Sequence, residues 1–163
     1  MPPAPKQYTD SIKSNHIAAI LARPGLCASL IVIEVCNTKG TPLLQLHNNI
    51  LVRLAKACPK LETVKITGAA NIDDSVLYAF LDNCTGWTTL QICGSCSKFG
   101  RMTGWALMAM KQNPQLGARL TSLHITNQPR KIDKAAKRLF FSRRGKLNVY
   151  IGRIKRLSME DLY

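Results

Sequence analysis

Apolar residues recur along this chain in a pattern that appears four times. Each segment has an apolar residue, two variable residues, an apolar residue, one variable residue and a further apolar residue. The last two apolar positions flank one variable position, as a strand with one buried face requires, so the pattern predicts four strands. The segments are Leu30/Ile33/Val35, Leu61/Val64/Ile66, Trp87/Leu90/Ile92 and Leu120/Leu123/Ile125, and they follow one another at similar but unequal intervals.

A turn-forming residue follows each predicted strand at the same distance. Two positions after the last apolar residue the chain carries Asn or Gly, the residues that best tolerate a positive φ angle. A left-handed turn in every unit would explain this choice. The four residues are Asn37, Gly68, Gly94 and Asn127.

Helix-length stretches with an apolar stripe accompany the predicted strands. Apolar residues about one turn apart predict helices over 10–22, 46–57, 73–81 and 103–111. The expected N-caps are Asp73 or Asp74 for the third helix and Thr103 for the fourth. Strands and helices alternating with a period of roughly 30 residues indicate an α/β solenoid, whose units share one core. An ordinary α/β sheet also alternates them but does not explain the repeated turn residue.

Two units carry a more specific motif. Residues 58–66 read CPKLETVKI and are followed by Ile72-Asp73-Asp74, while residues 84–92 read CTGWTTLQI, with Trp87 in the first apolar slot. This pattern resembles the cysteine-containing leucine-rich repeat of F-box-type ubiquitin-ligase substrate adaptors. The resemblance covers residues 10–127. It implies a short leucine-rich-repeat solenoid of four to five units, with a curved parallel sheet and outer helices.

The resemblance also implies a function. It suggests a non-enzymatic protein-interaction module that recognises a partner or substrate for ubiquitin ligation, with a cullin-type ubiquitin ligase as a candidate partner. The F-box itself is not recognisable here, so a ligase link needs an F-box encoded upstream or supplied by another subunit. In such repeats the side chains between the buried strand positions point to the concave face. The expected partner-binding residues form two rows, Val32, Thr63, Thr89 and Ser122, then Glu34, Lys65, Gln91 and His124.

The pattern continues in degenerate form beyond the fourth unit. Basic residues interleaved with apolar ones after residue 130 predict an amphipathic helix, and Leu147, Val149 and Ile151 predict a strand. The apolar residues of that helix are Ile132, Ala135, Leu139 and Phe140. The expected organisation is a flexible N-terminus at 1–9, four repeat units at 10–127, a basic degenerate capping unit at 128–152 that covers the open end, and a basic tail at 153–163.

Positive charge is concentrated in this last part. The chain of 163 residues has a formal net charge of +14; residues 1–127 hold 12 basic and 6 acidic residues, and residues 128–163 hold 11 and 3. A solvated outer face, an acidic protein partner and nucleic acid or anionic lipid all remain open explanations. The alternative function is therefore a basic nucleic-acid-binding protein acting through residues 130–156. Its basic patch would comprise Arg130, Lys131, Lys134, Lys137, Arg138, Arg143 and Arg144.

No arrangement of residues predicts catalysis, a metal site or a cofactor. The three histidines lie apart from any nucleophile motif, and no Gly-rich phosphate loop is present. Cys93 and Cys96 form a single Cys-x-x-Cys motif, whereas zinc needs four ligands; Cys58 and Cys84 are expected to be core thiols. We expect reduced cysteines, no secretory signal, no membrane span and a cytoplasmic or nuclear location, or both.

Overall fold

In the computed structural model, strands and helices alternate along the chain. The structure describes residues 14–35, 46–68, 70–94, 99–143 and 146–152. The strands are β1 (Val32–Val35), β2 (Thr63–Thr67), β3 (Thr89–Cys93), β4 (Ser122–Thr126) and β5 (Asn148–Gly152). The helices are α1 (Ser14–Leu21), α2 (Pro24–Ser29), α3 (Asn48–Ala57), α4 (Asp74–Asn83), α5 (Trp105–Gln112) and α6 (Lys131–Ser142). The expected segments 1–9 and 153–163 lie outside the described residues.

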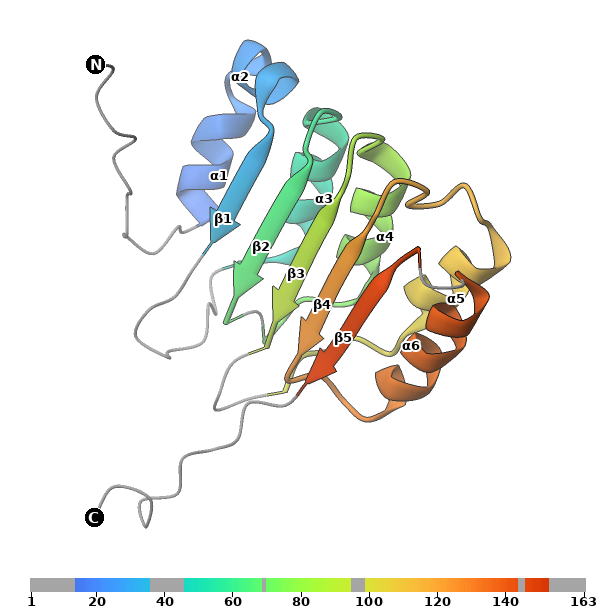
Figure 1. The fold of residues 1–163 in the computed structure, drawn as a ribbon. Coiled ribbons are helices and arrows are strands. Elements are labelled where there is room, and N and C mark those ends of the chain that lie inside the picture. The colour runs from blue at the N-terminus through green and yellow to red at the C-terminus, as the bar shows by residue number, and fades with distance from the viewer. Residues whose placement is uncertain (1–13, 36–45, 69, 95–98, 144–145, 153–163) are drawn as a thin grey trace, which may run out of the picture.

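The strands form one parallel sheet in chain order, β1-β2-β3-β4-β5. The register brings the last apolar residue of every unit into a single row, Val35, Ile66, Ile92, Ile125 and Ile151. The helices stand on one side of the sheet, and no described helix covers the other side (Figure 1). This arrangement confirms the predicted α/β solenoid with outer helices, and β5 supplies its fifth strand.

The core is continuous because neighbouring units share it. The inward-facing residues of the three central strands are at most 1% exposed: Val64, Ile66, Leu90, Ile92, Leu123 and Ile125. Phe80 of α4 stacks on Trp87 with ring centroids 5.2 Å apart, and both rings are buried. Fully burying one such side chain contributes about 1.5–3 kcal/mol. A single unit could not gain this burial energy by itself, because the apolar face of each unit is covered by the next unit.

The two motif cysteines are core thiols, as expected. Cys58 is 0% exposed and Cys84 is 2% exposed. The Cys84 thiol donates to the carbonyl oxygens of Cys58 at 3.4 Å and Ala55 at 3.6 Å. The thiol therefore joins the end of α3 to the end of α4, where each helix gives way to the next strand.

The expected left-handed turn is present at two of the predicted positions. Gly68 has φ +80° and Asn127 has φ +55°. Gly94 is not among the positive-φ residues of the described chain, so that explanation was wrong there. A Cβ atom on Gly94 would stand 2.4 Å from the carbonyl oxygen of Asn127, so the glycine is needed for close approach of the next unit. Asn37 lies outside the described residues.

The helix starts follow the predictions in part. Asp73 is the N-cap of α4, where its side chain accepts from Ser75 N at 2.9 Å. Thr103 is not the cap of α5, because α5 begins only at Trp105 and is preceded by Gly104 in the left-handed region at φ +94°. The predicted start of this helix at residue 103 was therefore too early. Of the first predicted helix, residues 10–13 lie outside the described residues.

A buried carboxylate explains the later start of α5. Asp74, the first residue of α4, is 1% exposed. It accepts from the backbone N–H groups of Thr103 at 2.6 Å, Gly104 at 3.0 Å and Ala106 at 3.2 Å, and from the Thr103 hydroxyl at 3.0 Å. These donors include amides at the start of α5 that have no partner within the helix. The preceding unit therefore caps α5.

Two further contacts of this kind join helix starts of neighbouring units. Asn48 Nδ2, at the start of α3, donates to Asp73 Oδ2 at 2.6 Å. Gln128, just before α6, accepts from Met102 N through its Oε1 at 3.2 Å. We call Asn48, Asp73, Asp74 and Gln128 the polar ladder, because each links its own unit to a neighbouring one.

The last helix is amphipathic, with one difference from the prediction. Ile132, Ala135, Ala136 and Leu139 are buried against the core. Phe140 was expected among these apolar residues but is 44% exposed. No helix within the described ranges is long and apolar enough to cross a membrane.

Candidate functional site

The predicted concave face is the side of the sheet without helices. Strand geometry places alternate residues on this side, and the parallel register aligns them from strand to strand. All eight residues proposed from the sequence lie here, in two straight rows extended by β5. The first row is Val32, Thr63, Thr89, Ser122 and Asn148, and the second is Glu34, Lys65, Gln91, His124 and Tyr150.

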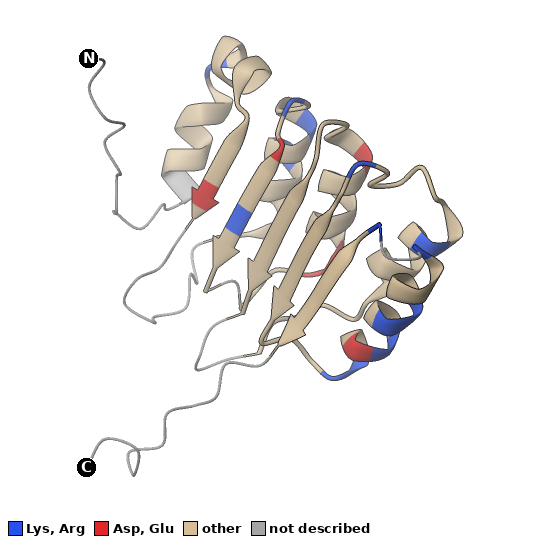
Figure 2. Cartoon of the chain, in the orientation of Figure 1, with Lys and Arg blue, Asp and Glu red and all other residues tan. Residues whose placement is uncertain are grey.

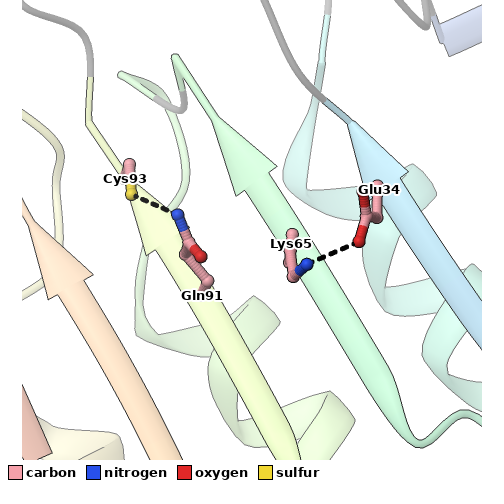
Figure 3. Close-up of polar contacts among 4 residues, drawn as sticks. All are labelled: Glu34, Lys65, Gln91 and Cys93. Atoms are coloured by element: carbon pink, nitrogen blue, oxygen red, sulfur yellow. Dashed lines mark hydrogen bonds and ion pairs between the residues drawn. The ribbon is translucent and has the colours of Figure 1, made fainter.

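An ion pair occupies the β1–β2 end of the second row. Lys65 Nζ lies 2.6 Å from Glu34 Oε1 (Figure 3). The two side chains are 38% and 47% exposed, and an ion pair in such a setting contributes at most about 1 kcal/mol to stability. Both charges can therefore be redirected to a bound partner at small cost to the fold.

The middle of the face is polar and uncharged. Gln91 lies half-buried on β3, and its Nε2 donates to the Cys93 Sγ at 3.4 Å (Figure 3). Thr63, Thr89 and Ser122 line the first row with short hydroxyl side chains that are half-buried. Short side chains leave room for a partner segment to approach the sheet, and amides and hydroxyls both donate and accept hydrogen bonds.

An aromatic pair closes the other end of the second row. The rings of His124 and Tyr150 lie 5.4 Å apart and are tilted by 35°. Tyr150 is 57% exposed. Tyr150 and Asn148 were missed as site residues, although they follow His124 and Ser122 at the same interval at which Ile151 follows Ile125. An exposed tyrosine beside an imidazole supplies large contact area together with hydrogen-bonding groups.

Apolar side chains are exposed where the first strand begins. Ile31 and Val32 are each 49% exposed. The face thus runs from aliphatic and charged groups at β1 to aromatic groups at β5. No cluster of three metal-ligating side chains occurs among the described residues. The chemistry of this face suits reversible contact with a polypeptide.

The predicted basic patch lies on a different element. Lys131, Lys134, Lys137 and Arg138 lie on α6, which is lined with Lys and Arg in Figure 2. Arg130 is exposed just before the helix, whereas Arg144 lies outside the described residues.

Arg143 differs from the other members of the basic patch. Its guanidinium donates to the carbonyl oxygens of Met110 at 3.0 Å, Pro114 at 2.8 Å and Leu116 at 2.8 Å. Partial burial also lowers the pKa of Arg143. This residue fastens α6 to the end of α5, so the exposed charge of the patch is smaller than the sequence indicates.

Comparison with solved structures supports the fold. The C-terminal domain of tropomodulin from Caenorhabditis elegans, a leucine-rich-repeat-type domain, aligns with a TM-score of 0.57 and 14% sequence identity. The match covers 88% of this chain and 85% of that chain. Similarity at this level of identity concerns the fold alone. No protein-family model matches the chain, and no curated protein matches it in sequence.

Proposed function

We propose that this chain is a non-enzymatic protein-interaction module that binds a protein partner through its concave face. The observation that carries the proposal is the alignment of ten side chains in two rows across five strands. Solenoids of this kind present extended concave surfaces, and these surfaces bind other proteins.

The composition of the face favours a polypeptide over nucleic acid. Lys65 is the only basic residue in the two rows apart from the imidazole of His124, and it already contacts Glu34. Phosphate backbones require several unpaired Lys or Arg side chains along the groove. The amide of Gln91 and the aromatic pair of His124 and Tyr150 instead suit a surface that exchanges hydrogen bonds and buries aromatic area.

Paired substitutions test the proposal. The variant Lys65→Ala with His124→Ala removes one group from each half of the second row. The matched control, Lys56→Ala with Lys111→Ala, removes two exposed charges from the helix side. Each chain is used as bait, and co-purifying proteins are quantified by mass spectrometry against the unsubstituted chain.

We expect one or more proteins to be retained by the control and depleted at least about tenfold by the concave-face variant, a change that corresponds to about 1.4 kcal/mol. Equal retention by both variants would move the interface away from this face. Circular dichroism and urea unfolding of both variants show whether the fold is preserved.

The finer proposal is substrate recognition for ubiquitin ligation. Its support is the sequence pattern of residues 58–74 and 84–92, which resembles the cysteine-containing repeats of F-box-type adaptors. A reciprocal pull-down with a cullin-ligase adaptor tests this link. Failure to recover the adaptor would remove the ligase role and leave the protein-interaction proposal standing, because the two depend on different contacts.

The nucleic-acid alternative has less support. It depends on residues 130–156, but Arg143 is engaged with three carbonyl oxygens and Asp133 lies within the same helix. Its remaining basis is the other basic residues of this segment, four of which lie on α6. Lys137 of α6 also lines an apolar groove, and this groove suggests a different kind of partner.

A further inference from the structure

The two ends of the solenoid differ in how well the last strand is covered. At the β1 end the inward-facing residues Ile33 and Val35 are 5% and 0% exposed. At the β5 end the equivalent residues Val149 and Ile151 are only half-buried, although their neighbours on β4 are fully buried. No described strand pairs with the outer edge of β5. The core therefore reaches the surface at this end.

An open groove of about 740 Å³ lies where the core reaches the surface. Ala136, Phe140 and Phe141 line it from α6, and Val149 and Ile151 line it from β5. Phe140 and Phe141 pack edge to face at 5.8 Å, and Phe141 is 75% exposed. Exposed apolar side chains next to a half-covered core are typical of interaction surfaces.

A buried glutamine also lines this groove. Gln128 is 3% exposed and its Oε1 accepts from Met102 N, which fixes the orientation of the amide. Its Nε2 has no hydrogen-bond partner among the described residues. The amide is buried against Gly100, so Gln128 belongs to the wall of the groove and offers no contact to a partner.

The helix that borders the groove is basic overall. Lys137 lines the groove together with Asp133, and α6 carries four basic residues against this one acid. Nucleic acid would satisfy the cations but would leave the aliphatic floor formed by Val149 and Ile151 uncovered. A partner with both apolar and acidic side chains matches the apolar floor and the cations of α6 together.

We propose that this groove docks an amphipathic helix of a partner protein, with apolar residues along one face and acidic residues beside them. Its apolar face covers Phe140, Val149 and Ile151, and its carboxylates meet Lys137. A helix laid across the end also shields the outer edge of β5, which pairs with no described strand. This interface is separate from the concave face and does not depend on the function proposed for it.

A designed peptide tests the proposal with the full chain. The probe is a fluorescein-labelled peptide of about 18 residues, about 27 Å long as a helix, with Leu at i, i+3, i+4 and i+7 and Glu on both flanks. A peptide of the same composition with scrambled positions is the control. Fluorescence anisotropy gives Kd, and NMR shifts of the Val149 and Ile151 methyl groups locate the site.

Substitutions at exposed positions separate docking from folding. We expect Phe141→Ser and Lys137→Glu each to weaken Kd by at least about tenfold. The matched controls Trp105→Ser and Lys111→Glu, which alter an exposed aromatic residue and an exposed cation on α5, should leave Kd within about twofold. The scrambled peptide should bind at least about tenfold more weakly than the probe.

Four results would overturn the proposal. The first is an equal effect of the groove and control substitutions on Kd. The second is equal binding of the scrambled peptide and the probe. The third is displacement of the probe by oligouridylate, which would assign the surface to nucleic acid. The fourth is prior occupation of the groove in the free chain, seen as a dimer by sedimentation or as NOEs from Val149 and Ile151 to residues 153–163.

Discussion

Gly68 and Gly94 hold the same place in successive repeats but are needed for different reasons. Gly68 adopts φ +80°, a conformation that side-chain-bearing residues rarely enter. At Gly94 the obstacle is the carbonyl oxygen of Asn127, which lies 2.4 Å from the place that a Cβ atom would take, with Asn127 Cβ at 3.0 Å. The positive φ of Gly68 belongs to the turn of its own repeat, so the repeat pattern could predict it. The close approach at Gly94 depends on the next unit, so the pattern could not.

The glycine positions give the first prediction. We expect Gly94→Ala to lower the free energy of unfolding by about 2 kcal/mol, because the added methyl group meets backbone that cannot move aside cheaply. Gly25→Ala is the control: a Cβ there has nothing within 4 Å, and alanine in α2 should stabilise the chain by about 0.5 kcal/mol. Urea denaturation measures both. A neutral effect of Gly94→Ala would show that the two units can separate slightly at no cost.

The buried thiols give a prediction about pH. Burial raises the pKa of Cys58 and of Cys84 from about 9 to about 12. The resulting stabilisation is fully present below about pH 9 and is lost as the pH rises toward 12, because only the unfolded chain then releases these protons. We expect the free energy of unfolding to fall above pH 9 by up to about 1.4 kcal/mol per thiol per pH unit.

Urea unfolding at a series of pH values checks this expectation. The double variant Cys58→Ala with Cys84→Ala should show a shallower decline, since lysines and tyrosines titrate in both chains. An identical pH dependence of the two chains would mean that the thiols ionise equally well when folded.

At the scale of elements, the start of a helix is fixed either by its own cap or by a neighbouring unit. The N-cap of α4 was predictable because Asp73 acts within its own helix. The start of α5 was not, because its amide donors bond to Asp74, which belongs to the preceding unit. The engagement of Arg143 with the end of α5 escaped prediction for the same reason.

Removing the carboxylate of Asp74 should therefore destabilise two units together. We expect Asp74→Ala to lower the free energy of unfolding by about 3 kcal/mol, since the backbone N–H groups of Thr103, Gly104 and Ala106 lose their acceptor at once. The matched control Asp82→Ala alters an exposed acid on the same helix and should change stability by less than about 0.5 kcal/mol. Chemical denaturation of both variants provides the comparison. Similar shifts in the two midpoints would show that Asp74 contributes only as a surface charge.

At the scale of the whole molecule, the alignment of the strands followed from apolar spacing, and the parallel sheet was implied by the resemblance to leucine-rich repeats. The second row of the concave face is a direct consequence, since every residue in it sits between two buried positions in the central strands. The groove at the β5 end did not follow from the sequence, because the amphipathic pattern of α6 gives no indication that Phe140 and Phe141 stay exposed. Exposure at the end of an array depends on what lies beyond it, which local periodicity does not describe.

The difference in burial and strand pairing between the central strands and β5 predicts a gradient of local stability along the sheet. Amides of β3 are bonded between two neighbouring strands under a fully buried core, whereas β5 has one described neighbour and a half-buried apolar side. We expect hydrogen exchange to be slowest in β2, β3 and β4 and faster in β5. Exchange monitored by mass spectrometry of peptides from 63–67, 89–93 and 148–152 measures this. Equal protection of β3 and β5 would indicate that the whole array opens only by global unfolding.

The polar ladder has a consequence for how such a chain can change over evolutionary time. Residues 68–73, 94–104 and 127–130 join strands to helices, and these connections differ widely in length. Asp74 of the preceding unit accepts from Gly104 N at the start of α5, and Gln128 of the following unit accepts from Met102 N two residues earlier. The connection from β3 therefore does not have to position α5 by itself. Insertions can accumulate in one connection without shifting the layers around it. The unequal intervals between the repeats then follow, because contacts between neighbouring units, and not the lengths of the connections, set the spacing of the units.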